Sequence, residues 1–291
     1  MKTEIINYDI DGKDFLGYAA FPDGENFPAV IIAHTWSGRD QFVDEKAEKL
    51  AENGYLGFAL DMYGDGIVGE TNEENAARMQ PLLDDRKELS KRVKAAYDKV
   101  SSLPGVDKSK IAVFGYCFGG LVSLDLARTG VDLRGSASFH GFLAGPEEPI
   151  NEQIKAKILA MHGMKDPMVG EDQMQSFYKE MSEKDVDWQL HIYGDSMHSF
   201  TNPEANNPDF GTVYSKEADI KVGDFVSSSP ASSLLPPNIP IGIVKSIDET
   251  SQSKKTAKIS LLAKPHLIDW VPVSYTHLRA HETDSYLVCR L

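Results

Sequence analysis

Residues 115–120, which read Gly-Tyr-Cys-Phe-Gly-Gly, constrain the fold of this chain more than any other segment. The apolar run 110–114 before them predicts a buried strand, and residues 121–127 after them predict a helix. A strand, a Gly-x-nucleophile-x-Gly turn and a helix in this order form a nucleophile elbow. We therefore expect Cys117 in a strained turn at the mouth of a sheet, where the positive end of the following helix favours its thiolate.

Two partners for such a nucleophile follow along the chain. Residues 156–161 predict a strand, and Asp166 lies on the loop after it. Residues 188–193 predict the next strand, and His198 lies on the loop after that one. The order of nucleophile, acid and histidine is typical of α/β-hydrolases. We expect His198 to take or hold the proton of Cys117, and Asp166 to orient the imidazole.

Each of these three residues also has a plain structural interpretation. A single cysteine is more often a small buried hydrophobic residue than a nucleophile. An aspartate before a proline, such as Asp166, often only initiates a turn. The histidines that compete with His198 are His34, His140, His162 and His191. The glycines around Cys117 and the chain order of the three residues favour the catalytic interpretation.

Residues 1 to about 219 resemble the dienelactone hydrolase family. The segments that carry the resemblance are 59–64, 115–120, 162–167 and 198–200. The resemblance implies an α/β-hydrolase fold with Cys117, Asp166 and His198 as its catalytic triad. It also implies an oxyanion hole made of the backbone N–H groups of Trp36 and Phe118. Such donors typically contribute about 3 kcal/mol each to transition-state stabilisation.

Two departures from the family pattern bear on the substrate. The members best known for dienelactone chemistry carry a glutamate that holds the resting cysteine, and Thr35 stands at the matching position here. They also carry an arginine for the substrate carboxylate four residues after the catalytic histidine, where this chain has Asn202. The sequence therefore predicts the hydrolase scaffold without dienelactone specificity, with Arg39 or Lys165 as candidate replacements for the lost charge.

The predicted sheet edge should also hold the substrate pocket, because ligands of parallel sheets bind at the carboxyl ends of the strands. His34 opens the oxyanion loop, and His140 ends the strand predicted over residues 136–139. We expect the pocket to be lined by Thr35, His140 and Asn202, and we expect His34 either to line it as well or to support it from behind. We expect His191 to be structural and His162 to pack beneath the acid loop.

Strand and helix patterns alternate along residues 1–219. A hairpin of residues 4–9 and 15–21 turns at Asp11-Gly12, and residues 82–102 predict one long helix. Repeated alternation implies an α/β fold with a mostly parallel sheet and helices on both faces.

Composition favours a protein that acts on a small molecule. The formal net charge is −14, and residues 220–291, with six acidic and eight basic side chains, leave −16 on residues 1–219. A segment with this much negative charge is a poor partner for nucleic acid or anionic membranes. No apolar run approaches the roughly 20 residues of a membrane span, and the N-terminus lacks the apolar core of a signal peptide. We expect a cytoplasmic monomer or weak dimer that needs no cofactor or metal.

The sequence changes character after Asp219. Family members continue there into a C-terminal helix, which we expect to be missing, because residues 221–272 alternate as short strands and contain proline-rich stretches. Residues 220–272 resemble the β-domain of a bacterial cell-shape-determining scaffold protein, and residues 273–291 look like translated sequencing adapter. We predict a truncated hydrolase domain over 1–219, a β-rich fragment of foreign origin over 220–272 and an unstructured tail over 273–291.

Three functions are compatible with these observations. The first is hydrolysis of small esters or lactones through a covalent acyl-enzyme. The second is ligand binding or thiol redox chemistry at Cys117 without turnover. The third, a periplasmic scaffold role for the tail, is disfavoured by the expected lack of a signal peptide or anchor. The elbow and its partners favour the first.

Overall fold

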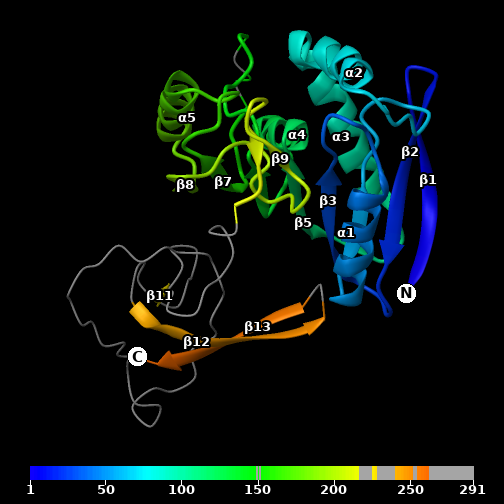
Figure 1. Cartoon of the computed structure of the whole chain (residues 1–291). Coiled ribbons are helices and arrows are strands. Elements are labelled where there is room, and N and C mark those ends of the chain that lie inside the picture. Colours follow the sequence, from blue (N-terminus) through cyan, green and yellow to red (C-terminus); the bar gives the residue numbers. More distant parts are fainter. Residues whose placement is uncertain (149, 151, 216–224, 228–239, 252–253, 262–291) are drawn as a thin grey trace. The chain divides into compact units, whose positions relative to one another are not determined.

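The computed structural model describes residues 1–148, 150, 152–215, 225–227, 240–251 and 254–261 (Figure 1). The contacts divide the chain into two compact units, Met1–Tyr214 and Ser215–Leu291. All the residues predicted to form the site lie in the first unit, and the two units are described separately.

The first unit is built on one sheet in the strand order β1-β2-β4-β3-β5-β6-β7-β8. Its strands are β1 (Lys2–Ile10), β2 (Lys13–Phe21), β3 (Phe27–Ala33), β4 (Leu56–Ala59), β5 (Val106–Tyr116), β6 (Gly135–Phe139), β7 (Lys157–Gly163) and β8 (Trp188–Tyr193). The β1–β2 and β2–β4 pairs are antiparallel, and the pairs from β4 through β8 are parallel. The prediction of a mostly parallel sheet is confirmed.

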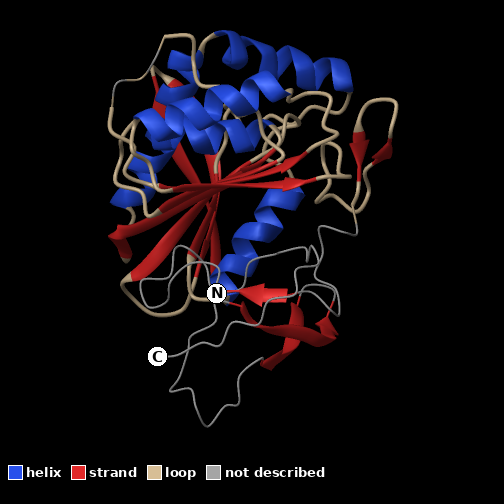
Figure 2. Cartoon of the chain, turned by 90° about the vertical axis from the view of Figure 1, so that its left-hand side faces the viewer, coloured by secondary structure: helices blue, strands red, loops and turns tan. Residues whose placement is uncertain are grey.

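Helices cover both faces of this sheet (Figure 2). They are α1 (Gln41–Glu52), α2 (Asn72–Asp84), α3 (Arg86–Ser102), α4 (Phe118–Arg128) and α5 (Glu171–Glu183). On one face, alanines and a valine of α1 form an apolar cluster with Ala20, Ile32 and Ala59 of the sheet. Buried side chains of α2, α3, α4 and α5 belong to the larger core. Every residue of α4 is buried, so the helix that follows the elbow is fixed on all sides.

The first hairpin turns where the sequence predicts. Asp11 and Gly12 both have positive φ, 55° and 81°, as the two central residues of a type I′ turn require. Ile10 pairs with Lys13 across the turn, which sets the register of β1 against β2.

The long helix expected over residues 82–102 is confirmed as α3, but it starts later than expected, because residues 82–84 belong to α2. α2 ends at Asp84, and α3 begins at Arg86. The carboxylate of Asp85 accepts a hydrogen bond from the Glu88 N–H at 2.9 Å, which satisfies a donor that the first turn of α3 would leave unpaired. Thr71 caps α2, since its Oγ1 accepts from the Glu74 N–H at 3.2 Å.

The described part of the second unit holds three strands, β11 (Phe225–Ser227), β12 (Pro240–Ser251) and β13 (Lys254–Leu261), in the antiparallel order β11-β12-β13. The C-terminal helix of the family is expected to be missing mostly over residues 216–224, and the adapter-like segment covers residues 273–291. Both segments lie outside the described residues. The three predicted parts of the chain therefore stay predictions. Among the described residues, no helix combines the length and the apolar character needed to cross a bilayer.

Candidate active site

Cys117 forms the turn between β5 and α4 and has the dihedral angles φ 55° and ψ −119°. A non-glycine residue at such a φ is strained, so the surrounding structure must hold it there. Two hydrogen bonds do so: the Cys117 N–H donates to the Phe139 carbonyl at 3.0 Å, and the Gly120 N–H donates to the Cys117 carbonyl at 3.0 Å. Cys117 is a half-buried free thiol at the N-terminus of α4, whose dipole favours negative charge there.

The glycines around Cys117 allow the elbow to lie close to the end of β3. A Cβ atom on Gly119 would lie 2.1 Å from the Ala33 carbonyl oxygen and 2.5 Å from that of His34. A Cβ atom on Gly115 would lie 2.1 Å from the Gly119 carbonyl oxygen. Both positions therefore require glycine for close approach of the backbone.

The predicted acid and histidine meet at the same edge of the sheet. His198 Nδ1 lies 2.7 Å from Asp166 Oδ2, and both side chains are buried. The other carboxylate oxygen of Asp166 accepts a hydrogen bond from the Met168 N–H at 2.9 Å. Asp166 is thus held at both oxygens, and it fixes the orientation of the His198 ring.

Electrostatics couple His198 to Cys117. Burial alone would lower the pKa of His198, but the negative charge of the Cys117 thiolate and the hydrogen bond to Asp166 raise it to about 10. Among the described residues, His198 Nε2 makes no hydrogen bond of ordinary geometry, so its coupling to Cys117 is chiefly electrostatic. Catalytic hydrogen bonds are often long in a free enzyme and shorten only when substrate binds.

A hydrogen-bonded loop carries Trp36 after β3. The Thr35 and Ser37 hydroxyls lie 2.9 Å apart, and Ser37 Oγ donates to Asp40 Oδ2 at 3.2 Å. The Tyr63 hydroxyl donates to the Trp36 carbonyl at 2.8 Å. These contacts hold the Trp36 peptide group in place, and they use the hydroxyl of Thr35 for the loop itself.

Of the two roles expected for His34, its contacts fit the supporting one and not the lining of a pocket. Its side chain is fully buried, the Met62 N–H donates to Nε2 at 3.1 Å, and Nδ1 lies 2.5 Å from the Thr35 carbonyl. Since Nε2 accepts, Nδ1 must carry the proton, and burial lowers the pKa of this neutral ring. His34 therefore joins the ends of β3 and β4 beneath the loop that carries Trp36.

His140 lies directly against His198. Their ring centroids are 5.0 Å apart with the rings at 67°, and His140 Nε2 lies 2.9 Å from Thr201 Oγ1. Burial, together with the positive charge of His198, lowers the pKa of His140 well below its usual value, so the ring is neutral. His140 is 3% exposed, and it supports the histidine loop more than it faces solvent.

Asn202 and the two candidate cations, Arg39 and Lys165, each interact with a different residue of the protein. Asn202 is exposed, and its Oδ1 accepts from the Glu204 N–H at 3.0 Å. Arg39 donates twice to Asp44, at 2.7 and 2.9 Å, and Lys165 pairs with Asp195 at 3.0 Å. The expected substrate-binding role of Asn202 thus has no support in the structure.

Sequence reasoning missed two residues that shape the site. Asp61 is buried, and its carboxylate accepts four backbone hydrogen bonds, from Leu16, Tyr63, Gly64 and Gly66. This holds the loop after β4, from which Tyr63 reaches the Trp36 carbonyl. Burial and the nearby Cys117 charge raise the pKa of Tyr63, so its hydroxyl stays a donor. The Asp-x-Tyr-Gly run at residues 61–64 was the available signal.

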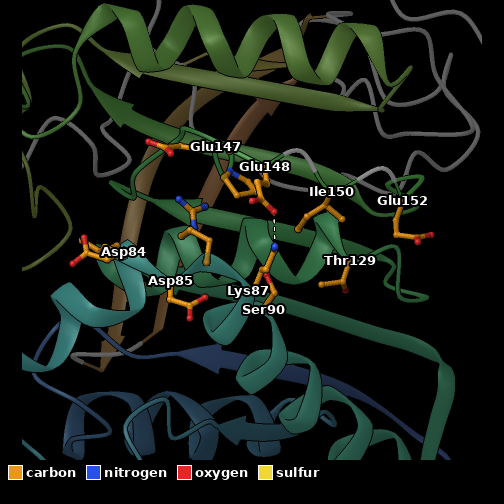
Figure 3. Close-up of a pocket in the computed structure, with 13 residues that line it drawn as sticks. Asp84, Asp85, Lys87, Ser90, Thr129, Glu147, Glu148, Ile150 and Glu152 are labelled. Carbon is orange, nitrogen blue, oxygen red and sulfur yellow. Dashed lines mark ion pairs between the residues drawn. The ribbon is translucent and has the colours of Figure 1, made fainter.

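A separate hollow of about 780 Å³ lies where α2 meets α3, beside the end of α4 and the loop after residue 144 (Figure 3). Its lining residues are Leu83, Asp84, Asp85, Arg86, Lys87, Ser90, Thr129, Gly145, Pro146, Glu147, Glu148, Ile150 and Glu152. An ion pair between Lys87 and Glu148 crosses it. None of the residues described above at the sheet edge contributes to this lining. Among the described residues, no three His, Cys, Asp or Glu side chains are placed to hold a metal ion.

Several known proteins are similar to this chain over most of their own length. A protein from Bradyrhizobium, described as a probable 2-oxo-3-(5-oxofuran-2-ylidene)propanoate lactonase, is 30% identical over 218 residues, which cover 69% of this chain and 86% of that protein. A solved dienelactone hydrolase-like promiscuous phosphotriesterase from metagenomic libraries is 31% identical with a TM-score of 0.70, covering 74% of this chain and 91% of that one. Another solved structure, m3DLH, is 32% identical with a TM-score of 0.70, covering 74% and 90%.

Two family models match the chain. The rod shape-determining protein MreC, barrel core, matches residues 189–274, in agreement with the resemblance noted for the segment after Asp219. The dienelactone hydrolase family matches residues 15–225, which span the elbow, the acid loop and the histidine loop. The chain therefore belongs to the dienelactone hydrolase family and is an enzyme of the ester and lactone hydrolase class.

Proposed function

We propose that this chain cleaves small carboxylic esters or lactones through a Cys117–His198–Asp166 triad and a covalent acyl-enzyme. One observation carries the proposal: a cysteine strained at the elbow is coupled electrostatically to a buried histidine that an aspartate holds at 2.7 Å. A thiolate beside an imidazolium is a strong nucleophile with its proton donor already in place.

The first half of the reaction forms a thioester. Cys117 Sγ attacks the carbonyl carbon, and the negative charge that develops on the carbonyl oxygen is stabilised by the N–H groups of Phe118 and Trp36. Phe118 is the first residue of α4, so its N–H has no acceptor within the helix. His198 then gives its proton to the leaving alkoxide oxygen as the carbon–oxygen bond breaks.

The second half restores the enzyme. Neutral His198 takes a proton from water while the water oxygen attacks the thioester carbonyl. The carbon–sulfur bond breaks, the acid product leaves, and the thiolate and imidazolium are present again. Asp166 keeps Nδ1 protonated throughout, so that Nε2 always faces the reaction.

The proposed substrate is uncharged. Asn202 is exposed at the position where a carboxylate-binding arginine is expected, and Arg39 is committed to Asp44. Position 35 holds a threonine, so no carboxylate there can hold the resting cysteine. The hydroxyl of Thr35 is bonded within its own loop. Neutral lactones and short esters are therefore the first compounds to test, with a phosphotriester as a further probe, because one similar solved protein is a promiscuous phosphotriesterase.

The test is hydrolysis of p-nitrophenyl acetate by the whole chain and by Cys117→Ala and His198→Ala. We expect each change to lower kcat by at least about a thousandfold. Cys289→Ser, at the other cysteine of the sequence, is the matched control and should keep wild-type activity. Full activity in Cys117→Ala would refute the proposal.

The alternative is ligand binding or thiol redox chemistry at Cys117 without turnover. It predicts rapid alkylation of Cys117 by iodoacetamide in a folded protein that cleaves no ester or lactone. Both functions need a reduced thiol, which fits the predicted cytoplasmic location. Neither requires a cofactor, and the predicted monomer or weak dimer, without nucleic-acid or membrane partners, stays a prediction.

A further inference from the structure

We propose that Phe210 is a specificity-determining residue, which together with Trp36 forms an apolar wall for the hydrocarbon part of the substrate. The inference rests on the proposed function, because Trp36 supplies one of the proposed oxyanion donors. Phe210 lies in the short hairpin β9 (Asn206–Asn207) to β10 (Thr212–Val213), which the sequence patterns did not reveal (Figure 1).

The hairpin is bonded to the backbone of His198 on both sides. The His198 N–H donates to the Gly211 carbonyl at 2.9 Å, and the Val213 N–H donates to the His198 carbonyl at 3.0 Å. A residue next to Gly211 therefore has a fixed position relative to the histidine.

The hairpin also lies against the acid loop. Gly211 has φ +81°, and a Cβ atom there would lie 2.2 Å from Pro167 Cγ, next to Asp166. The Phe210 N–H donates to Asn207 Oδ1 at 3.1 Å, which closes the turn. Phe210 thus sits on a short segment fixed by contacts with both proposed catalytic loops.

The ring of Phe210 reaches the third loop of the site. It stacks on Trp36 with the centroids 5.9 Å apart and the rings at 28°. Phe210 is nevertheless 42% exposed, so one face contacts Trp36 and much of the rest faces water. A large apolar ring that is held by both proposed catalytic loops and left exposed is suited to bind the apolar part of a substrate.

Two more exposed apolar side chains lie on a segment that is joined to the loop of Trp36. Ile67 is 37% and Val68 41% exposed, and their segment is joined to that loop by a Gly38–Val68 bridge and by the Gly69 N–H, which donates to the Ser37 carbonyl at 2.7 Å. We call Trp36, Ile67, Val68 and Phe210 the apolar rim. An uncharged rim of this kind fits the hydrocarbon chain of an ester better than a charged group.

Two ester series test the proposal. In one, p-nitrophenyl acetate, butyrate and hexanoate vary the acyl chain; in the other, ethyl, butyl and hexyl acetate vary the alcohol. We expect Phe210→Ala to lower kcat/KM for the longest member of one series about tenfold, and for the shortest member less than about threefold. Phe210→Leu should restore most of the preference. The matched control is Tyr55→Ala. It removes an exposed ring just before β4, at the amino-terminal ends of the parallel strands and not at the carboxyl ends where the site lies.

The outcomes separate this inference from the proposed function. Equal losses for short and long esters in both series would mean that Phe210 only stabilises the fold, and would overturn the inference. Wild-type cleavage that depends on Cys117, with chain-length preferences unchanged in Phe210→Ala, would also overturn it and leave the proposed function intact. If the folded wild-type chain cleaves no ester, both fail together.

Discussion

His198 is the residue at which the electrostatics of the site converge. Burial works against a charge on its ring, and the Cys117 thiolate and Asp166 work for it. The two attractions prevail, so that His198 holds its proton at neutral pH and releases it only as the pH rises through about 10. The neutral His140 ring beside it adds no opposing charge.

Replacing Cys117 by serine should lower the pKa of His198. The thiolate charge is then gone, while burial still disfavours the imidazolium. Nitrogen NMR of the imidazole ring from pH 5 to 10.5 checks this prediction. The wild-type ring should stay protonated beyond pH 8, and the Cys117→Ser ring should lose its proton at a clearly lower pH. Titration of His198 near pH 6.5 in the wild type would contradict the coupling.

Asp166→Asn should lower kcat by roughly a thousandfold to ten-thousandfold with little change in KM. An amide can present N–H to Nδ1, which favours the tautomer with the proton on the wrong ring nitrogen. Steady-state ester hydrolysis measures the effect. Asp195→Asn, at an exposed carboxylate in the histidine loop, should remain close to wild type, and an equal loss in both variants would argue against a specific role for Asp166.

At the scale of elements, the site depends on how closely α4 approaches β3. Glycine at positions 115 and 119 allows that approach, because a Cβ atom at either position would meet backbone atoms about 2.1 Å away. The sequence predicted this arrangement, because an elbow between an apolar strand and a helix has few alternative geometries.

Gly119→Ala should therefore destabilise the fold. The added methyl group would lie 2.1 Å from the Ala33 carbonyl oxygen, a backbone atom that cannot move without shifting β3. We expect a loss of at least about 2 kcal/mol in the free energy of unfolding, measured by urea denaturation. Gly194→Ala is the control, because a Cβ atom there would meet nothing within 4 Å. Equal stability of the two variants would show that the elbow tolerates a side chain.

At this scale, the sequence did not predict the exact boundary between α2 and α3 or the short β9–β10 hairpin. The expected start of the long helix at residue 82 lies inside α2, and the cap from Asp85 to Glu88 accounts for the observed start of α3 at Arg86. The β9–β10 hairpin has two-residue strands, which are too short to leave an alternating pattern. The positions of Cys117, Asp166 and His198 were predictable because each follows a strand of the sheet. The burial of His34 was not, because it depends on how β3 and β4 pair.

At the scale of the first unit, a buried ionic network joins three helices. Asp125 of α4 is 0% exposed and accepts from Arg86 of α3, at 2.6 Å twice, and from Arg128 at 2.9 Å. Arg128 in turn donates to Glu180 of α5 at 2.7 Å. The network therefore braces the helix that carries the elbow.

Asp125→Ala should cost about 3–5 kcal/mol of unfolding free energy, because it leaves the buried Arg128 without one of its carboxylates. Urea denaturation followed by circular dichroism measures the loss. Asp98→Ala removes one partner of the exposed Lys94–Asp98 pair and should cost less than about 1 kcal/mol. A similar small cost for Asp125→Ala would mean that the network does not brace the fold.

The central claim is that Cys117 carries the acyl group during turnover, and an acid-quench experiment tests it most directly. The whole chain is mixed with excess p-nitrophenyl acetate, quenched within the first turnover and digested for peptide mass spectrometry. We predict one acetyl group on the peptide that contains Cys117, formed together with a burst of p-nitrophenol equal to the enzyme concentration if deacylation limits the rate. Turnover without acetyl on Cys117, whether the group is found elsewhere or nowhere, would contradict the account.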